Sequence, residues 1–399
     1  MSASIAGAAF LASKGLQGVL GMLNGDGEEA RIAGGAVRNA LMGMEVSDVD
    51  IATTALPDET IRRAEAAGLR AVKTGFEHGT VTVIAGHQGY EVTTLRADIE
   101  TDGRRAKVAF GRSWQMDAER RDFTVNALYS GADGTITDLV GGLADIEKRH
   151  LRFIGDADQR IIEDGLRILR FFRFFAWFGG GRPDAEGLKA CARHKAMLAD
   201  LSAERIWAEL KKLLSAPDPA RALLWMRQAG VLSAVLPESE KWGIDAIHGL
   251  VETGRAQGWE ADPLLRLMAV VPPDAARMAG LALRLKLSRA EASRLENWAS
   301  TPMPDARMDD KAFARHLYRS NVAAVRDRVL LAAAKGDPEV PVKLAFLESW
   351  QKPVFPVNGK DLAASGLNGP ALGAALKVLE DRWIGSDFTL SRQALLDIQ

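Results

Sequence analysis

The sequence predicts an α+β protein, with a mixed-sheet domain over about the first 150 residues and helices over the rest. Short β-branched segments bounded by glycine or charged residues recur before residue 100, which is typical of strands. From Asp156 onward this pattern fades and apolar residues recur with helical spacing. These two observations put a sheet first and an all-helical part after it.

The individual elements follow from the same patterns. Residues Ala3 to Leu23 have helical spacing and end before Gly25, which predicts a single capped helix. Strands of one sheet are expected over residues 31–39, 46–51, 79–84 and 90–95, with a helix over 60–68. Helices are then expected over residues 160–178, 203–214, 219–229, 263–271, 289–298, 311–318 and 321–334.

Composition excludes several classes of protein. A chain of 399 residues that is 47% hydrophobic and 26% charged can bury a large core, so it is neither disordered nor a small disulfide-stapled module. No apolar run approaches the roughly 20 residues needed to span a bilayer, so we expect no membrane partner. The formal net charge of -1 demands no nucleic-acid partner, so any surface for one must arise from local clustering.

The cysteine count and the start of the chain predict its location. Cys191 is the only cysteine, which excludes internal disulfides and a cysteine-based zinc site. The small apolar stretch from Met1 to Leu11 has no basic residue before it, so no signal peptide is expected. We therefore expect a cytoplasmic protein, and the sequence points to no protein partner.

Asp48 and Asp50 form the first candidate site. They are two residues apart in an expected strand, so both carboxylates should project from one face of the sheet. Two like charges held this close are costly unless a cation neutralises them, and Mg²⁺ prefers carboxylate oxygens. Glu91 is a candidate third carboxylate, with an exposed strand glutamate as the equal alternative. A lone acidic pair is also typical of a solvated strand end, so the metal interpretation depends on the neighbouring motifs.

A glycine pair lies just upstream of these acids. Gly34 and Gly35 close an expected strand and open a helix that carries Arg38. Free backbone N–H groups at a helix start, together with a guanidinium group, could hold a triphosphate. A glycine pair alone is more often a turn. Combined with the two aspartates, it indicates a metal and a triphosphate side by side.

A second polar cluster spans residues 120–127. Arg120 and Arg121 stand beside Asp122, and Asn126 follows four residues later. These side chains could bind phosphates and a ribose hydroxyl. Taken alone, the segment is equally a helix start with solvated charges.

Charge is confined to one face of the expected helix after Asp156. Its charged stripe consists of Arg160, Glu163, Asp164, Arg167 and Arg170, with Arg173 at the edge. Ion pairs on a surface helix would explain this stripe.

Base chemistry offers a second interpretation of that stripe. Asp164 can only accept hydrogen bonds and Arg167 can only donate them, and three residues apart they present acceptor beside donor. Cytosine and adenine offer the complementary arrangement, whereas uracil and guanine offer the reverse. Because a mismatch would leave buried charges unpaired, this pair would select C and A.

Taken together, these motifs resemble the class II (bacterial and eukaryotic type) CCA-adding tRNA nucleotidyltransferases of the polymerase-β-like superfamily. The resemblance covers about residues 30 to 215, with five motifs in the family's order. They are Gly34–Arg38 with Asp48–Asp50, Arg120–Ala127, Asp138 with Gly142 and Asp145, Glu163–Phe174, and Ser202–Arg205. No single motif is specific, but their joint occurrence is.

The resemblance implies a domain organisation and an activity. It implies a nucleotidyltransferase head over residues 1–150, a nucleotide-selecting neck over 151–215, and a helical body and tail over 216–399 that hold tRNA. Two Mg²⁺ ions would be bound by Asp48 and Asp50. The tRNA 3′-hydroxyl would attack the α-phosphate of CTP or ATP and release pyrophosphate.

Further site residues are implied by the same resemblance. Asp164 and Arg167 would select the base. The nucleotide and its phosphates would be held by Gly35, Arg38, Arg121, Arg170 and Arg173, with Asp122 and Asn126 near the ribose and triphosphate and Glu163 beside the selecting pair. Residues 96–112 match the flexible loop that the family uses to switch from C to A addition.

Some features depart from the family pattern or are less informative. Asn39 replaces a frequent aspartate, and Gly165 inside the selecting helix should cost about 1 kcal/mol relative to alanine. Near the C-terminus, Lys360 and the glycines around it could meet tRNA phosphates, with an ordinary turn as the alternative. The tryptophans at 225, 242, 259 and 298 are interpreted as core residues.

Three other activities compete with CCA addition. A bacterial poly(A) polymerase shares the head and neck motifs, but we would expect a basic C-terminal extension, and residues 394–399 are not basic. A non-catalytic RNA-binding relative would not need the intact Asp48 and Asp50. A nucleotidyltransferase for a small molecule would have no use for the selecting helix.

Overall fold

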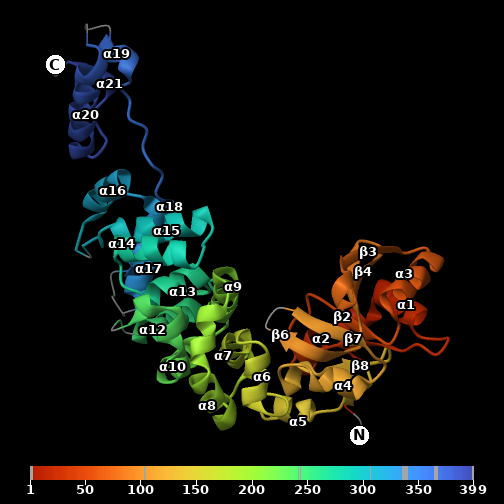
Figure 1. The fold of residues 1–399 in the computed structure, drawn as a ribbon. Coiled ribbons are helices and arrows are strands. Elements are labelled where there is room, and N and C mark those ends of the chain that lie inside the picture. The colour runs from red at the N-terminus through yellow and green to blue at the C-terminus, as the bar shows by residue number, and fades with distance from the viewer. Residues whose placement is uncertain are drawn as a thin grey trace. The chain divides into compact units, whose positions relative to one another are not determined.

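The computed structural model describes residues 3–102, 105–240, 242, 244–305, 307–334, 340–363 and 367–397. The chain folds into two compact units (Figure 1). The first comprises Met1–Ala216 with Arg221–Val235, and the second comprises Pro217–Ala220 with Leu236–Gln399. The predicted fold class is confirmed, because strands lie in the first part of the chain and helices follow.

Within the described residues, the first unit contains a seven-stranded sheet of order β3-β4-β5-β2-β1-β8-β9. Its strands are β1 (Ala30–Ala33), β2 (Asp50–Thr53), β3 (Arg70–Gly75), β4 (Thr80–Ala85), β5 (Gln88–Thr94), β8 (Leu128–Ser130) and β9 (Ile136–Asp138). The central strand β2 runs antiparallel to β1 and parallel to β5. The sequence predicted β4 and β5 and missed β3, β8 and β9. The strands expected over residues 31–39 and 46–51 overlap β1 and β2 only at residues 31–33 and 50–51.

The central strands β1 and β2 bury side chains on both faces of the sheet, because successive residues of a strand point to opposite faces. Ile32 and Ile51 belong to a core with α1 (Lys14–Leu23) and α3 (Pro57–Ala66). Their neighbours Ala33 and Ala52 belong to a second core with α4 (Trp114–Glu119). Each large apolar side chain buried this way contributes roughly 1.5–3 kcal/mol. The two cores therefore fix the register of β2, which carries Asp50.

The expected single helix over residues 3–23 is wrong. Residues 9–12 form a short 3₁₀ helix, and α1 begins only at Lys14. Ser13 separates them with an extended backbone, and its hydroxyl accepts a hydrogen bond from the Leu16 N–H. Because serine satisfies a free N–H group at a helix start, it favours a new start here over continuation.

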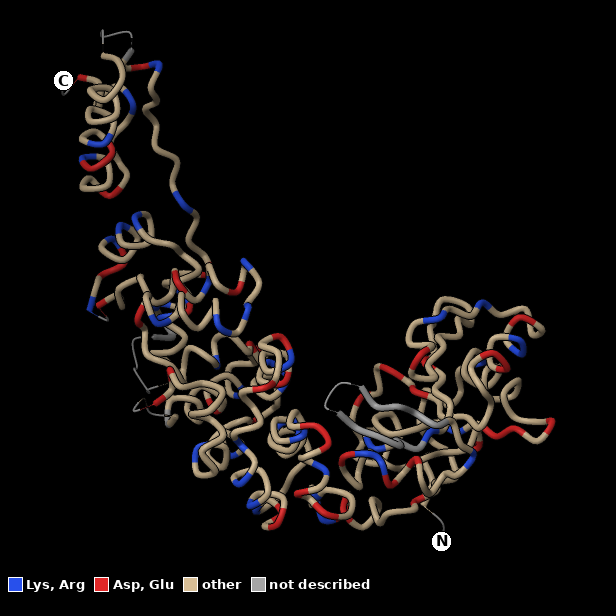
Figure 2. The backbone as a smooth tube through the Cα atoms, in the orientation of Figure 1, with Lys and Arg blue, Asp and Glu red and all other residues tan. Residues whose placement is uncertain are grey.

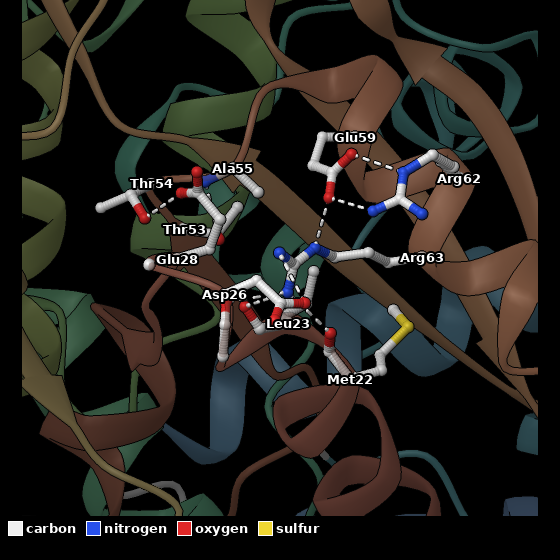
Figure 3. Close-up of polar contacts among 12 residues, drawn as sticks. Met22, Leu23, Asp26, Glu28, Thr53, Thr54, Ala55, Glu59, Arg62 and Arg63 are labelled. Carbon is white, nitrogen blue, oxygen red and sulfur yellow. Dashed lines mark hydrogen bonds and ion pairs between the residues drawn. The ribbon is translucent and has the colours of Figure 1, made fainter.

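Arg63 of α3 holds the C-terminal end of α1 in place (Figure 3). Its guanidinium group donates to the carbonyl oxygens of Met22 and Gly25, at 3.3 and 3.2 Å, and its Nε lies 2.6 Å from Glu59. The last carbonyls of a helix have no partner within it, so a cation there is stabilising.

Glu28 connects the turn after α1 to two other segments. Its carboxylate accepts hydrogen bonds from the Thr54 hydroxyl at 2.5 Å and from Arg112 at 2.7 Å (Figure 3 shows the Thr54 contact). Burial alone would raise the pKa of Glu28, but these two partners lower it. The turn thereby holds the segment around Arg112.

The expected flexible loop over residues 96–112 contains regular structure. Strands β6 (Arg96–Asp102) and β7 (Arg105–Phe110) pair antiparallel as a separate two-stranded sheet. Gly103 and Arg104 lie outside the described residues. This backbone pairing corrects the expectation of an irregular loop over most of the segment, and its role in switching from C to A addition stays a prediction.

The expected helix over residues 160–178 is two helices, α6 (Ala157–Glu163) and α7 (Leu166–Phe178). Asp164 has an extended backbone, with φ -155° and ψ 107°, and ends α6. Gly165 therefore lies in the break rather than inside a helix, so its expected cost does not arise. A methyl group on Gly165 would lie 3.2 Å from the Met197 Cβ.

Aromatic side chains join α7 to the segment after α4. The rings of Phe153 and Phe171 are stacked 5.5 Å apart, and Phe123 lies 4.8 Å from Phe153 and 5.4 Å from Phe174. This packing holds residues 120–127 against α7. The other helices of the unit are α2 (Gly35–Leu41), α5 (Gly142–Glu147), α8 (Ala185–Arg193), α9 (Ala203–Leu214), α10 (Ala220–Gln228) and α11 (Val231–Val235).

In the described residues of the second unit, the regular secondary structure is entirely helical. Its α-helices are α12 (Asp245–Gln257), α13 (Pro263–Val270), α14 (Ala275–Arg284), α15 (Arg289–Ser300), α16 (Asp310–Arg319), α17 (Val322–Ala333), α18 (Val340–Ser349), α19 (Gly359–Ala363), α20 (Gly369–Gly385) and α21 (Arg392–Leu396). The helices predicted over 263–271, 289–298, 311–318 and 321–334 are confirmed within two residues. None of the helices in the described part of the chain is both long and apolar enough to cross a bilayer.

Candidate active site

Asp50 is the first residue of β2, the central strand of the sheet. Its Cα faces that of Ala33 on β1 and that of Glu91 on β5. Asp48 precedes the strand, so the prediction that both aspartates lie on a strand is wrong for Asp48. Asp48 accepts a hydrogen bond from Ser47 at 3.0 Å.

Asp50 lies in a field of negative charge. Its pKa is raised, first by loss of hydration among the surrounding protein atoms, then by the charge of Glu91, with Asp48 adding a smaller effect and Arg121 opposing it. Neighbouring carboxylates make ionisation of Asp50 unfavourable, and a bound cation would reverse this.

The carboxylates fit a magnesium site that substrate would complete. Over the residues that the structure describes, no three His, Cys, Asp or Glu side chains form a ligand set of their own. Mg²⁺ usually takes only one or two carboxylates and fills its remaining positions with water and substrate phosphates. Asp48 and Asp50 match that requirement.

Gly34 brings the backbone close to two predicted site residues. It has φ 66°, a conformation that glycine adopts readily. A Cβ at this position would lie 3.1 Å from Nη1 of Arg121 and 3.3 Å from the carbonyl oxygen of Asn126. Helix α2 then begins at Gly35, as the sequence predicted.

Arg38 is buried, and among the described residues no carboxylate pairs directly with it. Its guanidinium group donates to Oδ1 of Asn126 and, at 2.8 Å, to Oδ1 of Asn39, and it lies 4.1 Å from the centre of the Phe178 ring. Burial and the positive charge of Arg173, with a smaller effect of Arg170, lower its pKa to about 10. A bound polyphosphate would relieve this crowding of cations.

Four predicted residues form one chain of hydrogen bonds. Asn126 accepts from Arg38 and donates to Oδ1 of Asp122 at 3.1 Å. Asp122 in turn pairs with Arg170 of α7, with Nη2 to Oδ2 at 2.5 Å. Although burial opposes it, Arg170 lowers the pKa of Asp122. The chain links the helix after the glycine pair to the helix after the break.

Asp117 and Tyr129 belong to the site and were missed from sequence. Asp117 is almost fully buried and pairs with Arg120 at 2.6 Å and with Arg121 at 3.0 Å. The Tyr129 hydroxyl donates to the same carboxylate at 2.7 Å. Asp117 orients Arg121 beside Gly34. Its spacing three and four residues before two arginines is the signal that could have found it.

Glu209 was also missed. It is buried on α9 and accepts a hydrogen bond from Nε of Arg173 at 2.6 Å. Burial and the nearby Arg170 lower the pKa of Arg173, whereas Glu209 raises it. A charged residue on an otherwise ordinary helix gives no sequence signal for this contact.

The predicted base-selecting residues are held by separate partners. Asp164 accepts from the Leu166 N–H at 3.1 Å and from Arg205 of α9 at 2.8 Å. Arg167 pairs with Glu163 at 2.5 Å, and Glu163 also pairs with Arg160 at 2.6 Å. The helix break means that Asp164 and Arg167 do not share one regular helical face. Lys360 is exposed on α19 of the second unit.

The chain that carries these site residues is similar to known proteins. Residues 30–152 match the model of the poly A polymerase head domain. Residues 182–242 match the model described as the probable RNA and SrmB-binding site of polymerase A. A mitochondrial CCA tRNA nucleotidyltransferase 1 of Mus musculus is 35% identical over 97% of this chain and 90% of the relative. This chain belongs to the CCA-adding tRNA nucleotidyltransferases.

Bacterial members of this family and solved structures also match this chain. A CCA-adding enzyme of Geobacillus thermodenitrificans is 36% identical over 86% of this chain and 85% of the relative. The structure of the Bacillus stearothermophilus CCA-adding enzyme in complex with CTP matches with a TM-score of 0.73 and 27% identity, over 94% of this chain and 93% of that one. The CCA-adding family therefore accounts for both units.

Proposed function

We propose that this protein adds C, C and A to the 3′ end of tRNA from CTP and ATP. One observation carries the proposal: Arg38, Arg170 and Arg173 crowd together around the hydrogen-bond chain through Asn126 and Asp122. The neighbouring Arg121 lies close enough to Asp50 to lower its pKa. Such a cluster fits a triphosphate beside a metal site. The tRNA 3′-hydroxyl would attack the nucleotide α-phosphate and release pyrophosphate.

We further propose that Asp48 and Asp50 hold two Mg²⁺ ions, with Glu91 as a third candidate ligand. Bound there, the ions would supply charge stabilisation at the reacting phosphate. The chain's own side chains do the rest. Arg38, Arg121, Arg170 and Arg173, with the backbone of Gly35, bind the phosphates, and Asn126 and Asp122 keep Arg38 and Arg170 oriented.

Base selection is proposed for Asp164 and Arg167, with corrected geometry. Asp164 accepts from the exocyclic amino group of C or A, and Arg167 donates to the ring nitrogen. Arg205 and Glu163 hold these two side chains in place in the free protein. UTP and GTP would place a carbonyl oxygen opposite the Asp164 carboxylate and an N–H group opposite the Arg167 guanidinium group, so they are rejected.

The Asp164→Ala variant should lose selectivity against UTP and GTP by about a hundredfold, since it removes the acceptor for the amino group. Selectivity is measured as the ratio of kcat/KM for CTP to that for UTP on one tRNA lacking its 3′ end. Asp158→Ala is the matched control, because Asp158 is also paired with an arginine but lies at the start of α6. An unchanged ratio in Asp164→Ala would remove the base-selecting role.

The overall activity is tested by incubating the protein and Mg²⁺ with tRNA lacking its 3′ end. Two C residues with CTP alone, followed by one A when ATP is added, are expected. A long A tail would indicate a poly(A) polymerase, and no incorporation would favour a non-catalytic RNA-binding relative.

We place the protein in the cytoplasm as part of this proposal, although one named relative is mitochondrial. Lys360 remains a proposed tRNA contact.

A further inference from the structure

A cavity of about 630 Å³ lies in the second unit, among α12, α13 and α17. Its volume is within the range of small-molecule sites. Lysine and arginine are interspersed with acidic residues along this unit (Figure 2), so a positive site must come from local arrangement. The wall of this cavity provides such a positive site.

Three arginines line the cavity, one from each helix: Arg255 of α12, Arg266 of α13 and Arg326 of α17. Arg255 and Arg326 are exposed, and the described part of the chain offers their side chains no carboxylate or other hydrogen-bond partner. Arg266 is only 7% exposed and lies near the charges of Asp218 and Asp262. Two guanidinium groups are therefore available at this cavity.

The acidic residues of the wall cancel only part of this charge, because Glu260 sets one exposed carboxylate against two guanidinium groups. Asp262 pairs with Arg294 at 2.5 Å, which leaves little negative charge for the cavity. Glu260 is the other acidic residue of the lining. The balance favours an anionic ligand.

An aromatic ring completes the wall. Trp259 was expected in the core, but it is only half-buried and lines the cavity. Its backbone N–H donates to the Gly254 carbonyl at 2.8 Å, and a Cβ on Gly254 would lie 3.7 Å from the ring. The turn after α12 thus fixes the backbone from which the ring projects. An aromatic face in the same cavity wall as the Arg255 and Arg326 guanidinium groups suits a base joined to a phosphate.

We propose that this cavity binds one nucleotide of the tRNA substrate, with its phosphate at Arg255 and Arg326 and its base against Trp259. The inference rests on the proposed function, because it takes tRNA as the substrate. A free nucleotide has the same chemistry and is the other source of such a ligand. The test below separates the two.

The first measurement compares the affinity for tRNA at several salt concentrations. The double variant Arg255→Ala/Arg326→Ala should bind about tenfold more weakly and should lower the salt slope by about 1, the value for one lost phosphate contact. The control is Arg277→Ala/Arg289→Ala, which removes the same charge from exposed positions elsewhere in this unit. Equal losses in both doubles would reduce the effect to net charge and overturn the proposal.

A second pair of variants tests the ring independently. Trp259→Ala should weaken tRNA binding about tenfold, whereas Trp259→Phe, which keeps a stacking face, should stay within about threefold. Thermal melting checks that both variants are folded. Equal loss in both variants, or no loss in either, would contradict a stacked base.

Titration with ATP and CTP decides the source of the nucleotide. If the arginine double lowers a measured affinity for free ATP but leaves tRNA binding unchanged, the site takes a free nucleotide and the tRNA assignment is wrong. Failure of the proposed function would look different. In that case the wild-type protein would incorporate no CTP into tRNA, whatever the cavity variants bind.

Discussion

Replacing Asp50 with asparagine should reduce CTP incorporation by about a thousandfold or more while leaving tRNA affinity within about twofold. The change keeps the shape of the side chain but removes its charge. Asp50 lies beside Glu91 and Asp48, so its pKa is already raised and its charge is the one a cation would compensate. Incorporation is measured under single-turnover conditions at saturating CTP, and binding is measured by filter retention.

The matched control is Asp58→Asn, an exposed acid in the first turn of α3 in the same unit. It should keep wild-type incorporation. Glu91→Gln then separates two kinds of site. A loss comparable to that of Asp50→Asn would make Glu91 a metal ligand, and near-normal turnover would limit the site to Asp48 and Asp50. Robust turnover by Asp50→Asn would contradict the metal assignment altogether.

Arg170→Met should lower the free energy of unfolding by about 3 kcal/mol at pH 8. The Asp122 side chain is only 8% exposed, against 32% for Arg170, so losing the arginine leaves the more buried partner without a counter-ion. Asp122→Asn in the Arg170→Met background should restore most of the stability, because it removes the uncompensated charge. Arg193→Met, at the more exposed pair with Asp158, should cost no more than about 1 kcal/mol.

The cost of Arg170→Met should also depend on pH. In the wild-type protein the pKa of Asp122 is lowered, so its contribution to stability is present above the unfolded pKa of about 3.9 and is lost as pH falls through the lower folded value. Without Arg170, burial is opposed only by the Asn126 hydrogen bond and the charge of Arg167, so we expect the pKa of Asp122 to rise. The difference between the two proteins should therefore shrink from pH 8 to pH 5, as urea unfolding can measure. A pH-independent difference would mean that lost packing, rather than the charge, is responsible.

The parts predicted correctly from sequence are those with local causes. Helices α9 and α13 follow from apolar spacing, and the Asp262 side chain also caps the start of α13. The strands β8 and β9 were missed because each has only three residues, too few to show alternation. The break at Asp164 was missed because the charged stripe has the same spacing on both sides of it.

The candidate site divides along similar lines. Gly34, Arg38 and Asp122 were found because they lie in motifs with recognisable spacing. Asp117 and Glu209 were missed because acidic residues on helices are usually exposed. Only the fold shows that Tyr129 and Arg173 approach them from distant segments. Sequence reveals which residues could do the chemistry, but not which buried partners orient them.

The double engagement of Asp164 limits how this protein can evolve. One carboxylate oxygen supports the first turn of α7 and the other anchors Arg205, while the same group is proposed to choose the base. A mutation of Asp164 that let the protein accept more kinds of nucleotide would also remove its contacts with α7 and Arg205. A substitution of Asp164 would therefore affect both stability and base selection. A lineage that changed its nucleotide preference would need compensating substitutions on α7 or α9 first.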